Sequence, residues 1–244
     1  MLRQVLIVAG LTVAASAVSA AEIHVITPGS AGGGLKALAE SWAAATGNKA
    51  TIENGGSGQI RNDVANGKAC DLVVLPPSEF PVLTPVIKPD TLTFVGTIPM
   101  AAVVKTGAPH PDISTLPKFI AAVKANGVGY ADPARGSTSG AQVAKMLTRP
   151  EFAGAKGTIT SGAPAGAVAK GEVPFGIGTL SEDSIPGADV IGNVPPELHM
   201  QLDISAAVCA KATDPATAAV FLKYITRPEA AADWKKGYLN LAHK

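Results

Sequence analysis

Residues 50–75 read ATIENGGSGQIRNDVANGKACDLVVL, and this stretch decides the fold class. Its first four residues form a short β-rich run that ends in an Asn-Gly-Gly turn. Ser57 then opens a segment with apolar residues at helical spacing, which ends at Gly67. The apolar run at residues 72–75 is typical of a strand that is covered on both faces. The stretch therefore predicts a β-turn-α-β unit, which belongs to a parallel sheet with covering helices.

The same alternation extends in both directions along the chain. Strands are predicted at residues 23–26, 100–105, 128–130, 158–160 and 174–177, and helices are predicted to begin near residues 30, 114, 139, 163, 215 and 228. Extended segments near residues 96–100 and 201–204 would carry the chain between two such blocks. We therefore expect an α/β protein with two lobes, each a mostly parallel sheet flanked by helices. Residues 21–97 and 204–244 would form lobe 1, residues 98–203 would form lobe 2, and a hinge would join them.

The composition excludes two classes of protein. The 244 residues are 47% hydrophobic, and 20 Lys and Arg face 19 Asp and Glu. A nucleic-acid-binding protein needs an excess of basic residues to neutralise phosphates, and this chain has none. A disordered chain would combine low hydrophobicity with high net charge, which is the opposite of this composition.

The N-terminus, MLRQVLIVAGLTVAASAVSAAE, predicts a signal peptide. Arg3 is the positive residue, residues 5–15 are apolar, and the small residues 18–20 form a cleavage site. A membrane anchor is the competing interpretation, but the stretch is short and lacks a stop-transfer pattern. Cleavage near Ala20 would leave 19 basic and 19 acidic side chains, because Arg3 is the charged residue that is removed. We expect an exported, unanchored protein in the periplasm.

Cys70 and Cys209 are the two cysteines of the chain. An oxidising compartment would allow them to form one long-range disulfide. Alternatively, both are small buried hydrophobic residues in apolar strands, because they occur in KACDLVVL and SAAVCAK. We favour the second interpretation and expect them to be unpaired.

Four serines share a position at which a strand turns into a predicted helix: Ser30, Ser57, Ser139 and Ser161. A helix N-terminus offers unpaired backbone N–H groups and the positive end of the helix dipole. Neighbouring glycines let the backbone approach a ligand, and serine adds a hydroxyl donor. If these turns converge, they form a neutral cage of donors around an anion. The alternative is that each serine is only an N-cap, as Ser139 and Gln142 at capping-box spacing suggest.

The motifs of several other functions are missing from the sequence. It contains no GxxxxGK[ST] or GxGxxG nucleotide-binding pattern. Its four histidines lack metal-ligand spacing, so no metal is expected. No Ser-His-Asp arrangement is recognisable by spacing. We expect no cofactor.

Residues 22–244 resemble the type II periplasmic solute-binding proteins, and among them the molybdate-binding family. The strand before Thr27-Pro28-Gly29-Ser30 resembles that family's first ligand loop, and GSGQIRNDVANGKACDLVVLP at residues 56–76 resembles its second. YADPARGSTSGAQVAKML at residues 130–147 is similar to the third, and TSGAPAGAVAKGEVPFGIGTLSED at residues 160–183 to the stretch with the fourth and fifth contacts. The resemblance implies the two-lobed periplasmic binding protein type II fold. It implies ligand contacts from Ser30, Ser57, Ser139 or its neighbour, Ser161 and Thr179.

Two kinds of residue depart from the molybdate-binding pattern. Thr179 stands where those proteins commonly have a tyrosine. Arg135 adds a cation to the third loop, and Arg61 lies one turn into the Ser57 helix. A guanidinium group can bind a carboxylate with two hydrogen bonds. Arg135 and Arg61 therefore make an organic acid anion a candidate ligand beside molybdate, although Arg135 could also be a solvated loop charge and Arg61 a structural residue.

The resemblance implies that the protein captures a small oxyanion, or an organic acid anion, between its lobes. It would be a monomer that delivers the anion to the membrane permease of an ABC importer. It would not be an enzyme. The alternative is an enzyme similar to aconitate isomerase, a relative of this family. In that case Arg61 and Arg135 would hold the carboxylates, and Glu53, Asp132 or Glu182 would be candidates for the base. A sensor that presents its closed form to a receptor is a third possibility.

Overall fold

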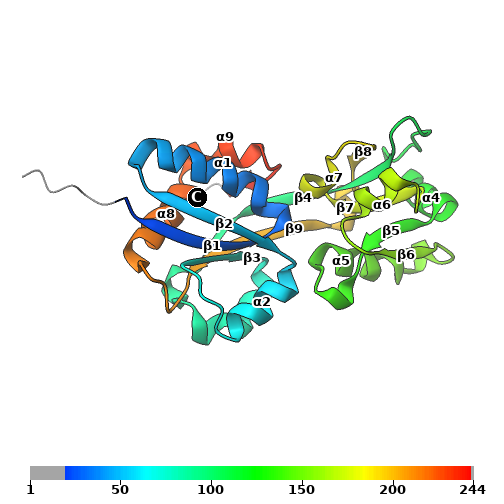
Figure 1. The fold of residues 1–244 in the computed structure, drawn as a ribbon. Helices are drawn as coiled ribbons and strands as arrows, with labels where there is room; N and C mark the ends of the chain where they lie inside the picture. Colours follow the sequence, from blue (N-terminus) through cyan, green and yellow to red (C-terminus); the bar gives the residue numbers. More distant parts are fainter. Residues whose placement is uncertain (1–19, 243–244) are drawn as a thin grey trace, which may run out of the picture.

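The computed structural model describes residues 20–242, which form two lobes side by side (Figure 1). The predicted signal peptide, apart from its last residue, lies outside the described residues. The predicted α/β class with two lobes is confirmed.

Lobe 1 is a sheet with helices on both faces. Its strands are β1 (Glu22–Pro28), β2 (Lys49–Gly55), β3 (Leu72–Leu75), the first part of β4 (Thr93–Lys105), β9 (Gln201–Val208) and β10 (Asn240–Leu241). Its helices are α1 (Gly29–Thr46), α2 (Ser57–Ala65), α3 (Phe80–Leu83), α8 (Pro215–Thr226) and α9 (Ala231–Lys235). Helices α1, α8 and α9 cover one face of the sheet, and α2 and α3 cover the other. Strand β3 is therefore buried on both faces, as its apolar run predicts.

Lobe 2 repeats this arrangement on a smaller scale. Its strands are the second part of β4, β5 (Val128–Ala131), β6 (Gly157–Thr160), β7 (Phe175–Thr179) and β8 (Ala188–Asn193). Its helices are α4 (Leu116–Asn126), α5 (Thr138–Leu147), α6 (Pro164–Lys170) and α7 (Leu180–Asp183). Helices α4 and α5 enclose one core and α6 another, on opposite faces of the sheet.

Short 3₁₀ turns complete both lobes, at Pro77–Glu79, Thr84–Val86, Pro89–Thr91, Pro133–Arg135, Pro150–Phe152, Pro196–Leu198 and Pro228–Ala230. Most of them begin at a proline, whose fixed φ angle suits the first position of a helical turn.

Strands β4 and β9 connect the lobes. The strand order is β2-β1-β3-β9-β4-β7-β5-β6, so β4 belongs to both lobes. Residues 93–99 of β4 pair with β9, and residues 100–104 pair with β7. In each lobe three strands are parallel, β1 with β2 and β3, and β5 with β6 and β7, whereas β4 and β9 run antiparallel to their neighbours. The carboxyl ends of both parallel sets lead into the helix starts that face the other lobe.

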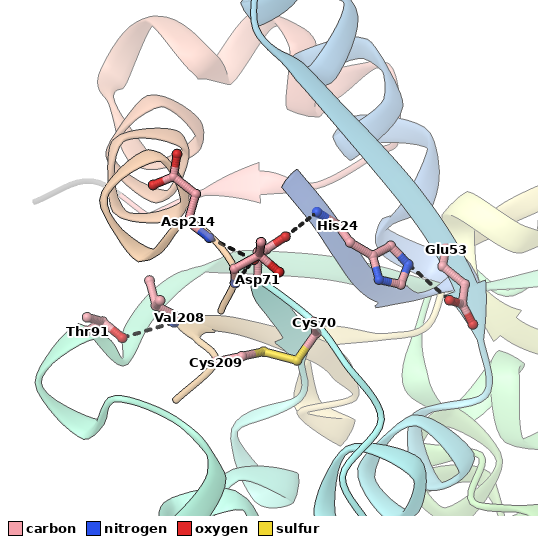
Figure 2. Close-up of a disulfide and its surroundings, with 9 residues drawn as sticks. His24, Glu53, Cys70, Asp71, Thr91, Val208, Cys209 and Asp214 are labelled. Atoms are coloured by element: carbon pink, nitrogen blue, oxygen red, sulfur yellow. Dashed lines mark hydrogen bonds and ion pairs between the residues drawn. A yellow bond between two sulfur atoms is a disulfide. The ribbon is translucent and has the colours of Figure 1, made fainter. Parts of the chain in front are cut away.

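The preference for unpaired cysteines is wrong, because Cys70 and Cys209 form a disulfide (Figure 2). Their Cα atoms are 5.9 Å apart, which is a normal disulfide separation. Strand β3 pairs antiparallel with β9 in a register that places Leu72 opposite Val208. This pairing brings together two strand ends that are separated by 139 residues in the sequence, and local patterns contain no sign of it.

The side chain of Asp71 fixes the backbone beside the disulfide (Figure 2). One carboxylate oxygen accepts the His24 N–H at 2.7 Å, and the other accepts the Thr213 N–H at 2.6 Å. Asp71 thereby joins β1, the start of β3 and the loop before α8 in lobe 1.

Candidate functional site

The helix starts of both lobes surround one cleft of about 230 Å³. From lobe 1 it is lined by Pro28, Gly29 and Ser30 at the start of α1, and by Gly55, Gly56, Ser57 and Gln59 at the start of α2. From lobe 2 it is lined by Ala131, Asp132, Arg135, Ser137, Thr138, Ser139, Ser161, Gly162, Ala163, Pro164 and Glu182. Leu202 of β9 also lines it. Two larger hollows, of about 530 and 650 Å³, are each lined by residues of a single lobe and contain no such convergence.

The two lobes touch at one edge of the cleft. The Gly58 N–H donates to the Gly136 carbonyl oxygen at 3.1 Å, which links α2 to the turn before α5. A Cβ atom on Gly58 would lie 2.6 Å from the Gly136 Cα atom, so only glycine permits this approach. Gly136 has a φ of 80°, which also favours glycine. The contact holds the two sets of helix starts opposite one another.

The serines at the helix starts of lobe 1 are not N-caps. Pro28 precedes α1 and Gly56 precedes α2, and neither makes a side-chain capping bond. Ser30 and Ser57 are instead buried residues of the first helical turns, and both line the cleft. Their hydroxyls and the nearby backbone N–H groups are therefore available to a ligand.

In α5 the predicted capping box is wrong. Ser137 is the N-cap, and its hydroxyl accepts the Gly140 N–H at 3.0 Å. Ser139 lies inside the first turn, buried, with its hydroxyl 3.3 Å from that of Ser137. The error of two residues arises because Ser137, Thr138 and Ser139 are all common capping types.

Of the seven residues that the sequence suggests as ligand contacts, five line the cleft: Ser30, Ser57, Arg135, Ser139 and Ser161. Arg135 is exposed, and one guanidinium nitrogen donates to the Ser161 carbonyl oxygen at 3.2 Å. This bond joins the third loop to the loop before α6. Within residues 20–242, the Arg135 guanidinium has no carboxylate at ion-pair distance, so its charge is available to an anion.

The other two suggested contacts lie outside the lining of the cleft. Arg61 forms an ion pair with Glu79, 2.9 Å away, within lobe 1. Thr179 is buried, and its hydroxyl donates to Glu182 Oε2 at 2.7 Å.

Glu182 and Asp183 are two adjacent acidic residues of α7, at the wall of the cleft and behind it, respectively. Glu182 lines the cleft, and burial raises the pKa of its carboxyl, although the Thr179 hydroxyl opposes that shift. Asp183 is fully buried. Burial, and then the charge of Glu182, raise the pKa of Asp183 to about 8. Backbone N–H groups of Ala165 and Gly178 face Asp183, yet neither carboxylate oxygen makes a hydrogen bond of ordinary geometry within the described residues.

Glu182 was expected only as one of three candidate bases, and the sequence did not point to Ser137, Gln59 or the contact between Gly58 and Gly136. The position of Glu182 three residues after a buried strand was the available signal. The other two candidate bases differ from it. Asp132 lines the cleft but its Oδ1 accepts the Ala134 N–H at 2.9 Å, and Glu53 pairs with His24 and Lys68 in lobe 1.

Two further observations concern metals and membranes. Within residues 20–242, no three or more His, Cys, Asp and Glu side chains are grouped so that they could hold a metal ion. Over the same residues, no helix is both long enough and apolar enough to span a membrane.

Two α/β lobes joined by crossing strands, with helix starts facing a shared cleft, define the class of two-lobed solute-binding proteins. The sequence pattern of the bacterial extracellular solute-binding proteins matches residues 23–238, and the chain belongs to that family.

The chain is also similar to individual proteins. An aconitate isomerase from Pseudomonas sp. is 29% identical over 219 residues, which cover 86% of this chain and 84% of that protein. The periplasmic molybdate-binding protein of Azotobacter vinelandii has a TM-score of 0.75 at 17% identity, over 91% of this chain and all of that one. The sulfate-binding protein SubI of Mycobacterium tuberculosis has a TM-score of 0.72 at 16% identity, over 90% and 86%. At these identities the solved structures establish the shared fold, and the predicted type II solute-binding fold is confirmed.

Proposed function

We propose that this protein binds a small organic acid anion or oxyanion in its interlobe cleft and delivers it to a membrane importer. The observation that carries the proposal is the convergence of the α1, α2 and α5 starts on a cleft that contains Arg135, which has no carboxylate partner within residues 20–242. Helix N-termini attract anions through their free N–H groups and dipoles. The guanidinium group adds a donor pair that suits a carboxylate.

Several features support capture followed by transport. The lobes are linked by two strands, and closure of such lobes around a ligand is a common hinge motion. The disulfide suits an oxidising compartment, as does the predicted signal peptide. We propose the permease of an ABC importer as the partner, because the chain belongs to a solute-binding family.

Thermal unfolding of the purified protein with a panel of anions tests the binding proposal. The panel contains molybdate, tungstate, sulfate, citrate, cis-aconitate and trans-aconitate. A ligand at about 100 times its dissociation constant adds about 2.7 kcal/mol to the free energy of unfolding, which is a clear upward shift of Tm. Stabilisation by citrate or an aconitate isomer supports an organic acid ligand. Stabilisation by molybdate and tungstate alone contradicts it, and no response to any of these anions contradicts the cleft proposal as a whole.

An isomerase acting on a tricarboxylate is the second candidate, and the similarity to an aconitate isomerase favours it. Such an enzyme moves a proton from a methylene carbon to the far carbon of the neighbouring double bond, which shifts the double bond. Glu182 would carry that proton, because it lines the cleft and the raised pKa of its carboxyl suits a general base. Against this candidate, Arg61 pairs with Glu79, so among the described residues that line the cleft Arg135 is the one Lys or Arg for three carboxylates.

Proton NMR separates the two candidates. Each aconitate isomer is incubated with the protein and followed over hours. If the protein interconverts the isomers and the Glu182→Gln variant does not, the protein is an isomerase and the binding-protein proposal is wrong. Binding without interconversion supports the binder.

A further inference from the structure

Glu182 places a carboxylate inside a cleft that is otherwise built to attract anions. It stands on α7 in lobe 2, directly after β7. Its Oε1 atom lies 2.9 Å from the position that a Cβ atom on Gly29 would occupy, so it reaches across the cleft to the first turn of α1. Glu182 is thus opposite the helix start that we expect to bind the ligand.

The two oxygens of Glu182 have different surroundings. Oε2 accepts the Thr179 hydroxyl at 2.7 Å, which fixes the carboxyl group. Oε1 has no hydrogen-bond donor or cation within the described residues, although it faces the cleft. It is therefore an acceptor with unused capacity beside the ligand position.

An ionised carboxylate accepts hydrogen bonds and cannot donate them. Molybdate, tungstate and sulfate are fully deprotonated at neutral pH. They therefore present to Oε1 only negatively charged oxygens, which accept hydrogen bonds and cannot donate them. The two groups would repel one another inside a partly dehydrated cleft. An anion that carries a hydroxyl group or a remaining proton can instead donate to Oε1.

We propose that Glu182 determines the specificity of the cleft by accepting a hydrogen bond from the ligand. The ligand class is then a small anion with its own donor, such as a hydroxycarboxylate or a hydrogen phosphate, and fully deprotonated oxyanions are rejected. This inference rests on the proposed function, because it takes an anion in the cleft as given. Burial raises the pKa of Glu182, which is consistent with a carboxyl group that gains a donor when the ligand binds.

Matched pairs of anions test the proposal on the unchanged protein by isothermal titration calorimetry at pH 8. Hydrogen phosphate and sulfate are both dianions of similar shape, but only the first carries a proton. Citrate and tricarballylate, and malate and succinate, differ by one hydroxyl group. Within a pair that binds, we expect the anion with the extra proton or hydroxyl group to bind at least about tenfold more tightly than its partner. The partner cannot donate to Glu182, and a lost hydrogen bond leaves a buried polar group unpaired.

Glu182→Gln is the test variant, because glutamine keeps the shape and can still accept the Thr179 hydroxyl. Its amide also donates, so the preference should fall by about fivefold or more, mainly through tighter binding of sulfate, tricarballylate or succinate. Glu172→Gln is the matched control. It removes one exposed carboxylate just after α6 in the same lobe, away from the residues that line the cleft.

Each outcome decides a different question. A wild-type protein that binds anions with equal or reversed preference within the pairs overturns the inference, even if the variant does not fold. An unchanged preference in folded Glu182→Gln overturns it too, as does an equal change in Glu172→Gln, which would show an effect of net charge. A wild-type protein that binds none of the six anions overturns the proposed function, and the inference with it.

Discussion

The two lobes contribute different chemistry to the same cleft. The residues of lobe 1 that line it are uncharged and supply the first turns of α1 and α2. Lobe 2 supplies the charged groups Asp132, Arg135 and Glu182. Their interiors differ as well. Lobe 1 contains the disulfide, and its buried Asp71 accepts backbone N–H groups, whereas the buried Asp183 of lobe 2 has no hydrogen bond of ordinary geometry within the described residues. We infer that lobe 1 is a rigid surface for anions in general and that lobe 2 selects among them.

Loss of the disulfide should have the largest effect and should weaken lobe 1 first. The bond closes a loop of 139 residues, so the double variant Cys70→Ala/Cys209→Ala should lose up to about 5 kcal/mol in the free energy of unfolding. Urea unfolding of the oxidised protein and of the variant measures this loss.

Hydrogen exchange shows where the loss is felt. We expect faster exchange in β3 and β9 and little change in β5 and β6, because the cysteines flank the first pair. Equal acceleration in both lobes, or a loss below about 1 kcal/mol, would contradict a special rigidity of lobe 1.

The second prediction concerns the buried carboxyl of lobe 2. The pKa of Asp183 is about 8 in the folded protein and 3.8 in the unfolded chain. The folded state therefore binds the extra proton between these values, and stability falls as the pH rises from about 4 to about 8. Each unit of pKa is worth about 1.4 kcal/mol, so ionisation of Asp183 in the folded state costs several kcal/mol at pH 8.

Asp183→Asn removes that ionisation and therefore tests whether a buried carboxyl destabilises lobe 2 at high pH. After subtraction of about 1–3 kcal/mol for burying the amide, we expect a gain of roughly 3 kcal/mol at pH 8. Little or no gain is expected at pH 5, where the folded carboxyl is already protonated. Chemical unfolding at the two pH values measures the difference. The same gain at both would show that ionisation is not the cause.

Local sequence patterns predicted the units of this fold but not all the pairings between them. The apolar run of β3 and Ser57 at the start of α2 are local signals, so this strand and this helix were predicted correctly. The disulfide depends on the register between β3 and β9, which no local pattern encodes. The same limit applies to Arg61. It follows Ser57 by one turn, but its side chain reaches Glu79, whose position depends on the path of the chain after β3.

The third prediction tests whether the selective cation belongs to lobe 2. Arg135→Ala should weaken anion binding about 10- to 100-fold, because charge-assisted hydrogen bonds are worth about 1.5–3 kcal/mol. Arg61→Gln removes a cation of lobe 1 that lies outside the cleft lining, and we expect less than about a twofold change there. Titration calorimetry with the anion that stabilises the wild-type protein measures both. A greater loss in Arg61→Gln would place the ligand-binding charge in lobe 1.

The smallest predicted effect concerns the contact that brings the lobes together. In Gly58→Ala the new methyl group would lie 2.6 Å from the Gly136 Cα atom, so the lobes must separate slightly at that edge. Overpacking of this kind costs about 1–3 kcal/mol, but a hinged cleft can relieve most of it by opening, which leaves about a five- to tenfold loss of affinity. Gly166→Ala is the control, because Gly166 lies within α6 and no atom of the described residues is within 4 Å of its added methyl group. If the contact matters only when the lobes are closed, Gly58→Ala should lower the affinity and leave the Tm of the ligand-free protein nearly unchanged. A fall in that Tm with unchanged affinity would instead mean that the contact supports the fold, and that the separate roles of the lobes do not depend on their closure at this edge.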